Sequence, residues 1–130
     1  MSEDLGKLVL RLNLGGLLLF HGVNKLLNGL TPIKTMLSAH NIPEFVAYGV
    51  YLGELVAPIL IIIGLFSRVG GAIVVFNMLV AVVLVGSANL LSIAPTGGYA
   101  LELEAFYLFG ALAVTLLGAG RIAVGPPRWN

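Results

Sequence analysis

Hydrophobic residues fill four long stretches of this chain, and charged or turn-forming residues separate the stretches. They cover about residues 5–27, 45–66, 69–91 and 99–120. A membrane-crossing helix needs about 20 apolar residues to traverse about 30 Å of hydrocarbon. Because lipid offers no partner to free backbone groups, each stretch predicts an α-helix. The pattern therefore predicts an all-α fold, an integral membrane four-helix transmembrane bundle, with residues 1–130 as a single domain.

The connecting segments predict how these helices join. Only Ser67 and Arg68 separate the second stretch from the third, which predicts a tight helical hairpin. Residues 28–44 form the long loop, in which residues 33–40 predict a short interfacial helix between two prolines. Residues 92–98 contain a proline and a glycine pair, which predict a turn before the last helix.

The N-terminal stretch is expected to be a retained helix and not a cleaved signal. The chain opens with the acidic residues Glu3 and Asp4, where a secretory signal has basic ones. No small-residue cleavage site follows the apolar run.

Composition agrees with the membrane prediction. Hydrophobic residues make up 58% of the chain and charged residues 10%, with a mean hydropathy of +1.02. Soluble domains average about 45–50% apolar and about 25% charged residues. A net charge of +1 gives no support for nucleic-acid binding. The absence of cysteine excludes disulfides and thiol redox chemistry within this chain.

The basic residues predict the orientation in the membrane. Four spans place both termini on one side, and five basic residues fall toward that side against two toward the other: Lys7, Arg11, Arg68, Arg121 and Arg128 against Lys25 and Lys34. The positive-inside rule then predicts cytoplasmic termini. The tail at residues 125–130 is expected to be non-helical, with Trp129 as an interfacial anchor.

Several ionisable residues lie inside the predicted spans. Such residues are expensive in lipid, so they are expected to face the bundle interior and to pair. On the first helix one stripe at helical spacing carries two of them together with two glycines and a leucine: Arg11, Gly15, Leu18, Gly22 and Lys25. Glu54 falls near the predicted midplane, and Lys25 or His21 is its nearest candidate partner by depth.

These positions predict a small-ligand cavity in the outer half of the bundle. His21, Lys25 and Glu54 are expected to converge there with either Glu102 or Glu104, which are roughly 200° apart on a helix and cannot both face it. Four tyrosines at similar depth are candidates for its wall: Tyr48, Tyr51, Tyr99 and Tyr107. The predicted ligand-binding set is His21, Lys25, Tyr51, Glu54 and Glu102. No spacing typical of a metal site accompanies it.

Structural roles explain the same residues in a second interpretation. Lys25 can extend to the interface, His21 can be a packing residue, and Glu54 can belong to an interhelical ion pair. Arg11, Arg68 and Arg121 are expected to be structural polar residues. The tyrosines suit an interfacial belt.

Three motifs in this chain resemble those of the DoxX family. The first helix ends with Phe-His-Gly-Val-Asn-Lys-Leu at residues 20–26, and the second helix runs from Gly53-Glu54 to Gly-Leu-Phe-Ser-Arg at residues 64–68. The last motif is Gly-Ala-Gly-Arg at residues 118–121. The match extends over residues 8–124 in the family's order and spacing. The chain differs where members often have a histidine, near Gly86 and Ser87.

The resemblance implies a small four-helix protein of the bacterial cytoplasmic membrane, in which Lys25, Glu54 and Arg68 are the family-pattern polar residues. Family relatives include the DoxD subunit of a thiosulfate:quinone oxidoreductase, proteins linked to quinone and oxidative stress, and distantly a receptor chaperone. The resemblance thus implies either a redox subunit or a helper protein.

Three functions follow as hypotheses. The leading one is a membrane protein that binds a small amphipathic molecule such as a quinone, as the membrane subunit of a redox complex with a partner protein. As an enzyme it would be a quinone-linked oxidoreductase subunit. The alternatives are a non-catalytic chaperone or assembly factor, and a small proton-coupled transporter that works as a homodimer.

Overall fold

The structure is a computed structural model that describes residues 1–86, 91–126 and 130, with the side chains of residues 85 and 86 excepted. Its regular elements within this part are helices: α1 (Ser2–Asn28), α2 (Thr31–Ala39), η1 (Glu44–Tyr48), α3 (Gly49–Tyr51), η2 (Leu52–Val56), α4 (Ala57–Ile63), α5 (Ser67–Ala81), η3 (Val82–Gly86) and α6 (Glu102–Leu117). The element η1 is a 3-10 helix, whereas η2 and η3 are π-helices. The all-helical prediction is confirmed for the described part of the chain.

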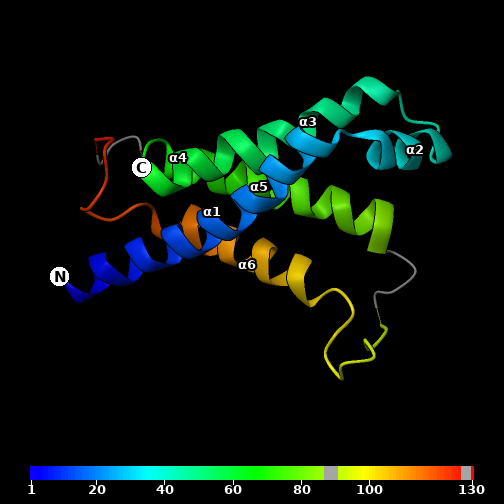
Figure 1. Cartoon of the computed structure of the whole chain (residues 1–130). Helices are drawn as coiled ribbons and strands as arrows, with labels where there is room; N and C mark the ends of the chain where they lie inside the picture. The colour runs from blue at the N-terminus through cyan, green and yellow to red at the C-terminus, as the bar shows by residue number, and fades with distance from the viewer. Residues whose placement is uncertain (87–90, 127–129) are drawn as a thin grey trace.

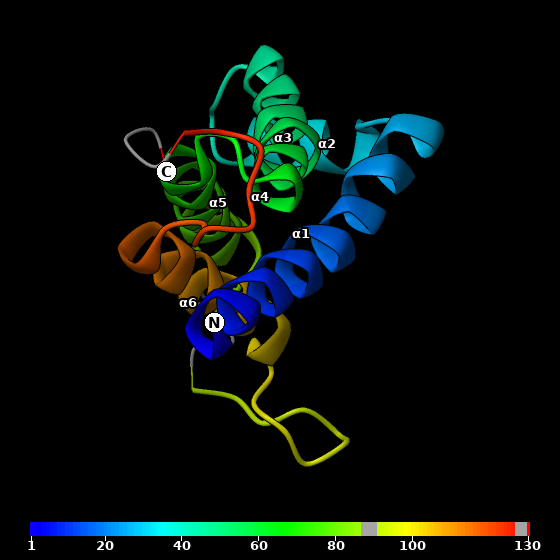
Figure 2. The same cartoon turned by 90° about the vertical axis from the view of Figure 1, so that its left-hand side faces the viewer.

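Four long helical segments pack beside one another (Figure 1). They are α1, the continuous run from η1 to α4, the run from α5 to η3, and α6. The α5 helix packs against α4 and α6, and α1 packs against α4, η2 and α6. Both chain termini lie at one end of the molecule and α2 lies at the other, as Figure 1 and the end-on view of Figure 2 show.

The predicted tight hairpin between the second and third stretches is confirmed. The α4 helix ends at Ile63, and α5 begins at Ser67. Gly64 has a φ of 76°, and Phe66 has a φ of 51°. Two left-handed residues reverse the chain within one turn, and glycine adopts this conformation without steric cost. The predicted short helix in the long loop is also confirmed, as α2, with Pro32 in its first turn.

The predicted buried stripe on the first helix is confirmed over most of its length. Arg11, Gly15, Leu18 and Gly22 are buried, together with Leu14. The apolar core that this face contacts is contributed by every long segment and includes Leu18, Ile61, Val74, Ala111 and Val114. Helical spacing therefore identified the correct face of α1.

The last helix differs from its prediction. The structure gives α6 16 residues, Glu102–Leu117, instead of residues 99–120. Its C-terminus is set by Gly118, whose φ of 79° ends the helix. Ahead of α6, an isolated antiparallel bridge joins Ile93 to Tyr99 within the turn region. At 1.5 Å per residue, α6 is about 24 Å long.

Two segments of the described chain are long and apolar enough to cross a membrane by length and composition, Glu44–Ile63 and Ser67–Leu84. Large apolar side chains cover the outward surface, among them Phe20, Phe76, Phe106 and Phe109, each at least 65% exposed. Such a surface suits contact with lipid. The four-span arrangement stays a prediction, and residues 87–90, Arg128 and Trp129 lie outside the described part.

Candidate functional site

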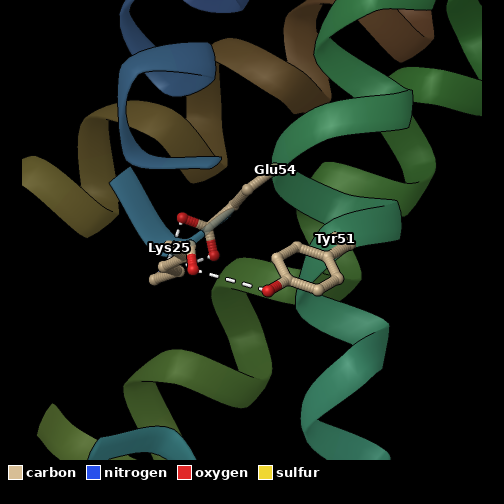
Figure 3. Close-up of polar contacts among 3 residues, drawn as sticks. All are labelled: Lys25, Tyr51 and Glu54. Carbon is tan, nitrogen blue, oxygen red and sulfur yellow. Dashed lines mark hydrogen bonds and ion pairs between the residues drawn. The ribbon is translucent and has the colours of Figure 1, made fainter. Parts of the chain in front are cut away.

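An ion pair between α1 and η2 lies at the centre of the candidate site. The Lys25 Nζ atom lies 2.6 Å from both carboxylate oxygens of Glu54. The Glu54 side chain is only 6% exposed, and that of Lys25 is 27% exposed. Tyr51 donates a hydrogen bond from its hydroxyl to the Lys25 backbone carbonyl at 3.4 Å (Figure 3). A nearly buried carboxylate is thus neutralised by a partly exposed ammonium group.

Gly22 allows the two helices to come this close. It lies almost one turn before Lys25 and faces the backbone of Glu54. A Cβ atom added at Gly22 would lie 2.6 Å from the Glu54 carbonyl carbon and still closer to its oxygen. Since real Cβ atoms do not approach a backbone so closely, only glycine permits this contact. The absence of a side chain at Gly22 therefore sets the distance across which Lys25 reaches Glu54.

Glu54 lies in the π-helical turn η2, Leu52–Val56. A π-helical turn contains one residue more than an α-helical turn, and such turns occur frequently at functional sites. Within η2, both Gly53 and Glu54 are buried. Gly53 faces the side chain of Asn77 on α5, and Glu54 meets Lys25 on α1. This turn brings three helical segments together at one level.

Beside the ion pair lies a cavity of about 170 Å³. It is bounded by α1, α2, the η2 region, α5 and α6, and most of its wall is aliphatic. Within the described part of the chain, six polar or aromatic-polar side chains line it: His21, Lys25, Glu54, Asn77, Glu104 and Tyr107. The rings of His21 and Tyr107 make an edge-to-face contact with centroids 5.8 Å apart. An apolar space with a few polar groups is the usual composition of a small-ligand site.

The structure brings together three of the five predicted ligand-binding residues, His21, Lys25 and Glu54. Glu102 lies elsewhere: it is exposed and lines an outward depression beside Tyr99 and Phe106. Glu104 faces the cavity in its place because it shares a face of α6 with Tyr107.

The tyrosines proposed for the cavity wall also lie in different places. Tyr51 donates its hydroxyl hydrogen bond to the backbone carbonyl of Lys25 and does not line the cavity. Tyr48 lies away from the cavity, and the Lys34 ammonium lies over its ring, 5.0 Å from the ring centroid. Tyr107 alone among the four tyrosines lines the cavity.

Asn77 is a lining residue that the sequence analysis missed. It is the only strongly polar side chain in the apolar run at residues 69–86, and this was the signal that could have identified it. Its amide makes no hydrogen bond to another described residue, although it faces the cavity. An amide in an apolar environment is costly when it has no partner. The cavity therefore contains a free donor and acceptor next to the ion pair.

The three arginines predicted to be structural lie away from this cavity. Arg11 is 1% exposed, and its guanidinium donates to the carbonyls of Ile61, Ile62, Ala119 and Ile122 at 2.7–3.0 Å. It thereby joins the end of α4 to the segment after α6. Within the described residues, no group of three or more His, Asp or Glu side chains forms a metal site.

Arg68 plays a similar role at the end of α6. It donates to the carbonyls of Thr115 and Leu116 and to that of Asn130. Arg121 is exposed, and its backbone N–H donates to Asp4.

Comparison with known proteins gives one match. The family model described as DoxX matches residues 6–87, which is more than half of the chain. The matched part contains Gly22, Lys25, Glu54 and Asn77. No curated protein and no solved structure matches the chain.

Proposed function

The chain belongs to the DoxX family, and we propose that this membrane protein binds a small amphipathic molecule such as a quinone in the cavity beside Lys25 and Glu54. The observation that carries the proposal is the ion pair itself. Both of its side chains, Lys25 and Glu54, face an otherwise mostly aliphatic space that also contains an unpaired amide. Ionisable groups at such positions in membrane helices commonly mark ligand or proton sites.

The polar side chains suit both forms of a quinone. The Lys25 ammonium can donate to a quinone carbonyl, and the Glu54 carboxylate can accept from the hydroxyl of a quinol. Asn77 can do either, since its amide has a donor and an acceptor. The aliphatic wall accommodates the ring. One set of residues therefore serves the oxidised and the reduced head.

The proposal extends to a redox complex. Reduction of a quinone to a quinol takes up two electrons and two protons. This chain contains no cysteine that could supply the electrons as a thiol pair, and we assign them to a partner protein or a bound cofactor. Glu54 and Glu104 face the cavity and are the groups that exchange protons with the quinone head.

We also propose four membrane spans, with both termini on the cytoplasmic side of the bacterial inner membrane. The four long helical segments pack side by side, and the termini lie at one end (Figure 1). Lys7, Arg11, Arg68 and Arg121 belong to that end, which supports the orientation by the positive-inside rule. Contacts from Arg11 and Arg68 to residues 115–122 and 130 support one domain that extends beyond the matched part.

Substitution of Glu54 tests the binding proposal. The protein is purified in lipid nanodiscs, and its thermal unfolding is followed with and without a decyl-tailed benzoquinone. Glu54→Gln is expected to remain folded and to lose the quinone-dependent rise in Tm. Glu102→Gln is the matched control, because Glu102 faces the outer depression, and it is expected to keep that rise. If Glu54→Gln only lowers the Tm and quinone still stabilises it, Glu54 is a structural member of an ion pair.

Native mass spectrometry of gently extracted protein separates this proposal from the chaperone hypothesis. A retained quinone supports ligand binding. A co-purifying protein partner without a small molecule contradicts it and favours an assembly factor.

A further inference from the structure

An apolar groove of about 190 Å³ adjoins the cavity. It lies between α2, the run from η1 to η2, and α5. Among the described residues that line it, Asn77 is the only one with a polar side chain, and the others are aliphatic, aromatic or glycine. Its outer wall includes Leu52, which is 49% exposed, and Phe76, which is 70% exposed. The groove thus runs toward the surface that suits lipid.

The cavity and the groove share a wall. Five of the described residues line both spaces: Ile33, Val50, Asn77, Val80 and Leu84. Of the described residues that line the two spaces, every one with an ionisable side chain lines the cavity and not the groove. Polarity therefore falls from the ion pair, past Asn77, to the exposed apolar surface.

Asn77 lies at the boundary between the two spaces. Its side chain occupies the room left by Gly53, where an added Cβ atom would lie 2.6 Å from the Asn77 amide carbon. The amide has no hydrogen-bond partner among the described residues and lines both spaces. A ligand atom at this point would satisfy it.

We infer that the groove holds the apolar tail of the molecule whose polar head occupies the cavity, and that the Asn77 amide contacts the head where the tail begins. This inference rests on the proposed function and adds the chemical class of the ligand: one polar head with a single long apolar chain. Ligand sites usually enclose about 300–1,000 Å³. Each space alone is smaller than that, and only together do the two spaces reach the lower end of this range.

Gly49 provides a way to fill the groove without touching the cavity. It lines the groove only, and a Cβ atom added there meets no atom within 4 Å. Gly49→Phe is therefore expected to fold and to occupy the groove. Gly16→Phe is the matched control, since Gly16 also lies in a helix, has the same open surroundings and lines neither space.

The test is photo-crosslinking of the full chain in nanodiscs. The probe is a benzoquinone with a diazirine near the middle of a decyl tail, and peptide mass spectrometry locates the label. In the unsubstituted protein, label is expected on groove residues such as Leu52 and Phe76, and excess tail-free benzoquinone should suppress it. Gly49→Phe should reduce this labelling by about fivefold or more, because the tail and the new ring compete for one space. Gly16→Phe should leave it unchanged.

The other outcomes are distinguishable. If the quinone stabilises the protein but its tail labels the exposed apolar faces evenly, the tail does not bind in the groove and the inference is wrong while the proposed function stands. If a diazirine-bearing phosphatidylcholine labels the groove as strongly as the quinone and competes with it, ordinary lipid is the occupant and the inference is again wrong. If the quinone neither stabilises nor labels the protein, the proposed function itself fails.

Discussion

Replacement of Gly22 by alanine tests the contact on which the candidate site depends. The added Cβ atom would lie 2.6 Å from the Glu54 carbonyl carbon and 2.9 Å from the Leu55 Cδ2 atom. Carbon atoms in ordinary contact lie about 3.5–4.0 Å apart. The backbones of α1 and η2 must therefore separate by roughly 1 Å, because a backbone carbonyl cannot rotate away as a flexible side chain can.

The expected loss of stability follows from two opposing terms. Overpacking of a tightly packed contact typically costs about 1–3 kcal/mol, and the backbone contact here places Gly22→Ala near the upper end. Alanine is also a better helix former than glycine by about 1 kcal/mol, which offsets part of this loss. The free energy of unfolding should therefore fall by about 2 kcal/mol. Gly16→Ala, with nothing within 4 Å of its new Cβ atom, should be neutral or stabilising by up to about 1 kcal/mol.

The assay is equilibrium unfolding of both variants in mixed micelles, with far-UV circular dichroism as the measure of helix. A quinone-binding measurement on the folded variants accompanies it. The same separation would stretch the 2.6 Å contact between Lys25 and Glu54, so Gly22→Ala should also bind quinone more weakly than Gly16→Ala. Equal stability of the two variants would show that α1 and η2 do not approach as closely as the structure has them.

Three further predictions use the same unfolding measurement. Arg11→Met should lower the free energy of unfolding by about 2–4 kcal/mol, because each of the four hydrogen bonds that it removes contributes about 0.6–1 kcal/mol. Arg121→Met, at an exposed position, should change the free energy of unfolding by less than about 0.5 kcal/mol. Equal effects of the two substitutions would show that the Arg11 guanidinium does not join α4 to the segment after α6. Asn130→Ala should cost about 1–2 kcal/mol, since its amide donates to Gly64 and accepts from the Ser67 backbone; an unchanged stability contradicts this. A double-mutant cycle of Lys25→Met and Glu54→Gln should give a coupling of about 1 kcal/mol, and purely additive effects would mean that the pair does not form.

Local patterns predicted much of the fold. The stripe from Arg11 to Gly22 identified the buried face of α1 because helical spacing fixes which side chains share a face. The short Ser67–Arg68 connection predicted the hairpin because two apolar runs had no room for any other link. These are properties of one element or of two neighbours, which sequence spacing determines directly.

Properties that depend on the rotation of one helix against others could not be predicted. Spacing showed that only one of Glu102 and Glu104 can face the cavity. The choice depended on how α6 packs on α1 and α5. The buried residues Tyr107, Ala111 and Val114 lie on the same face of α6 as Glu104. The π-helical turn at Glu54 shifts side-chain directions by one residue, and no residue type in Leu52–Val56 predicts it.

The hydrogen bonds of Arg11 constrain the order of events during synthesis. Two of its carbonyl partners, Ala119 and Ile122, are 108 and 111 residues away in the chain. At about 5–20 residues per second, α1 leaves the ribosome roughly 5–20 s before these carbonyls exist. During that interval the carbonyls of Ile61 and Ile62 can accept from the guanidinium group, but its remaining N–H donors have to be accommodated by water, lipid headgroups or the insertion machinery. The first helix therefore enters the membrane with a charged group whose full set of partners exists only after the last segment has been made.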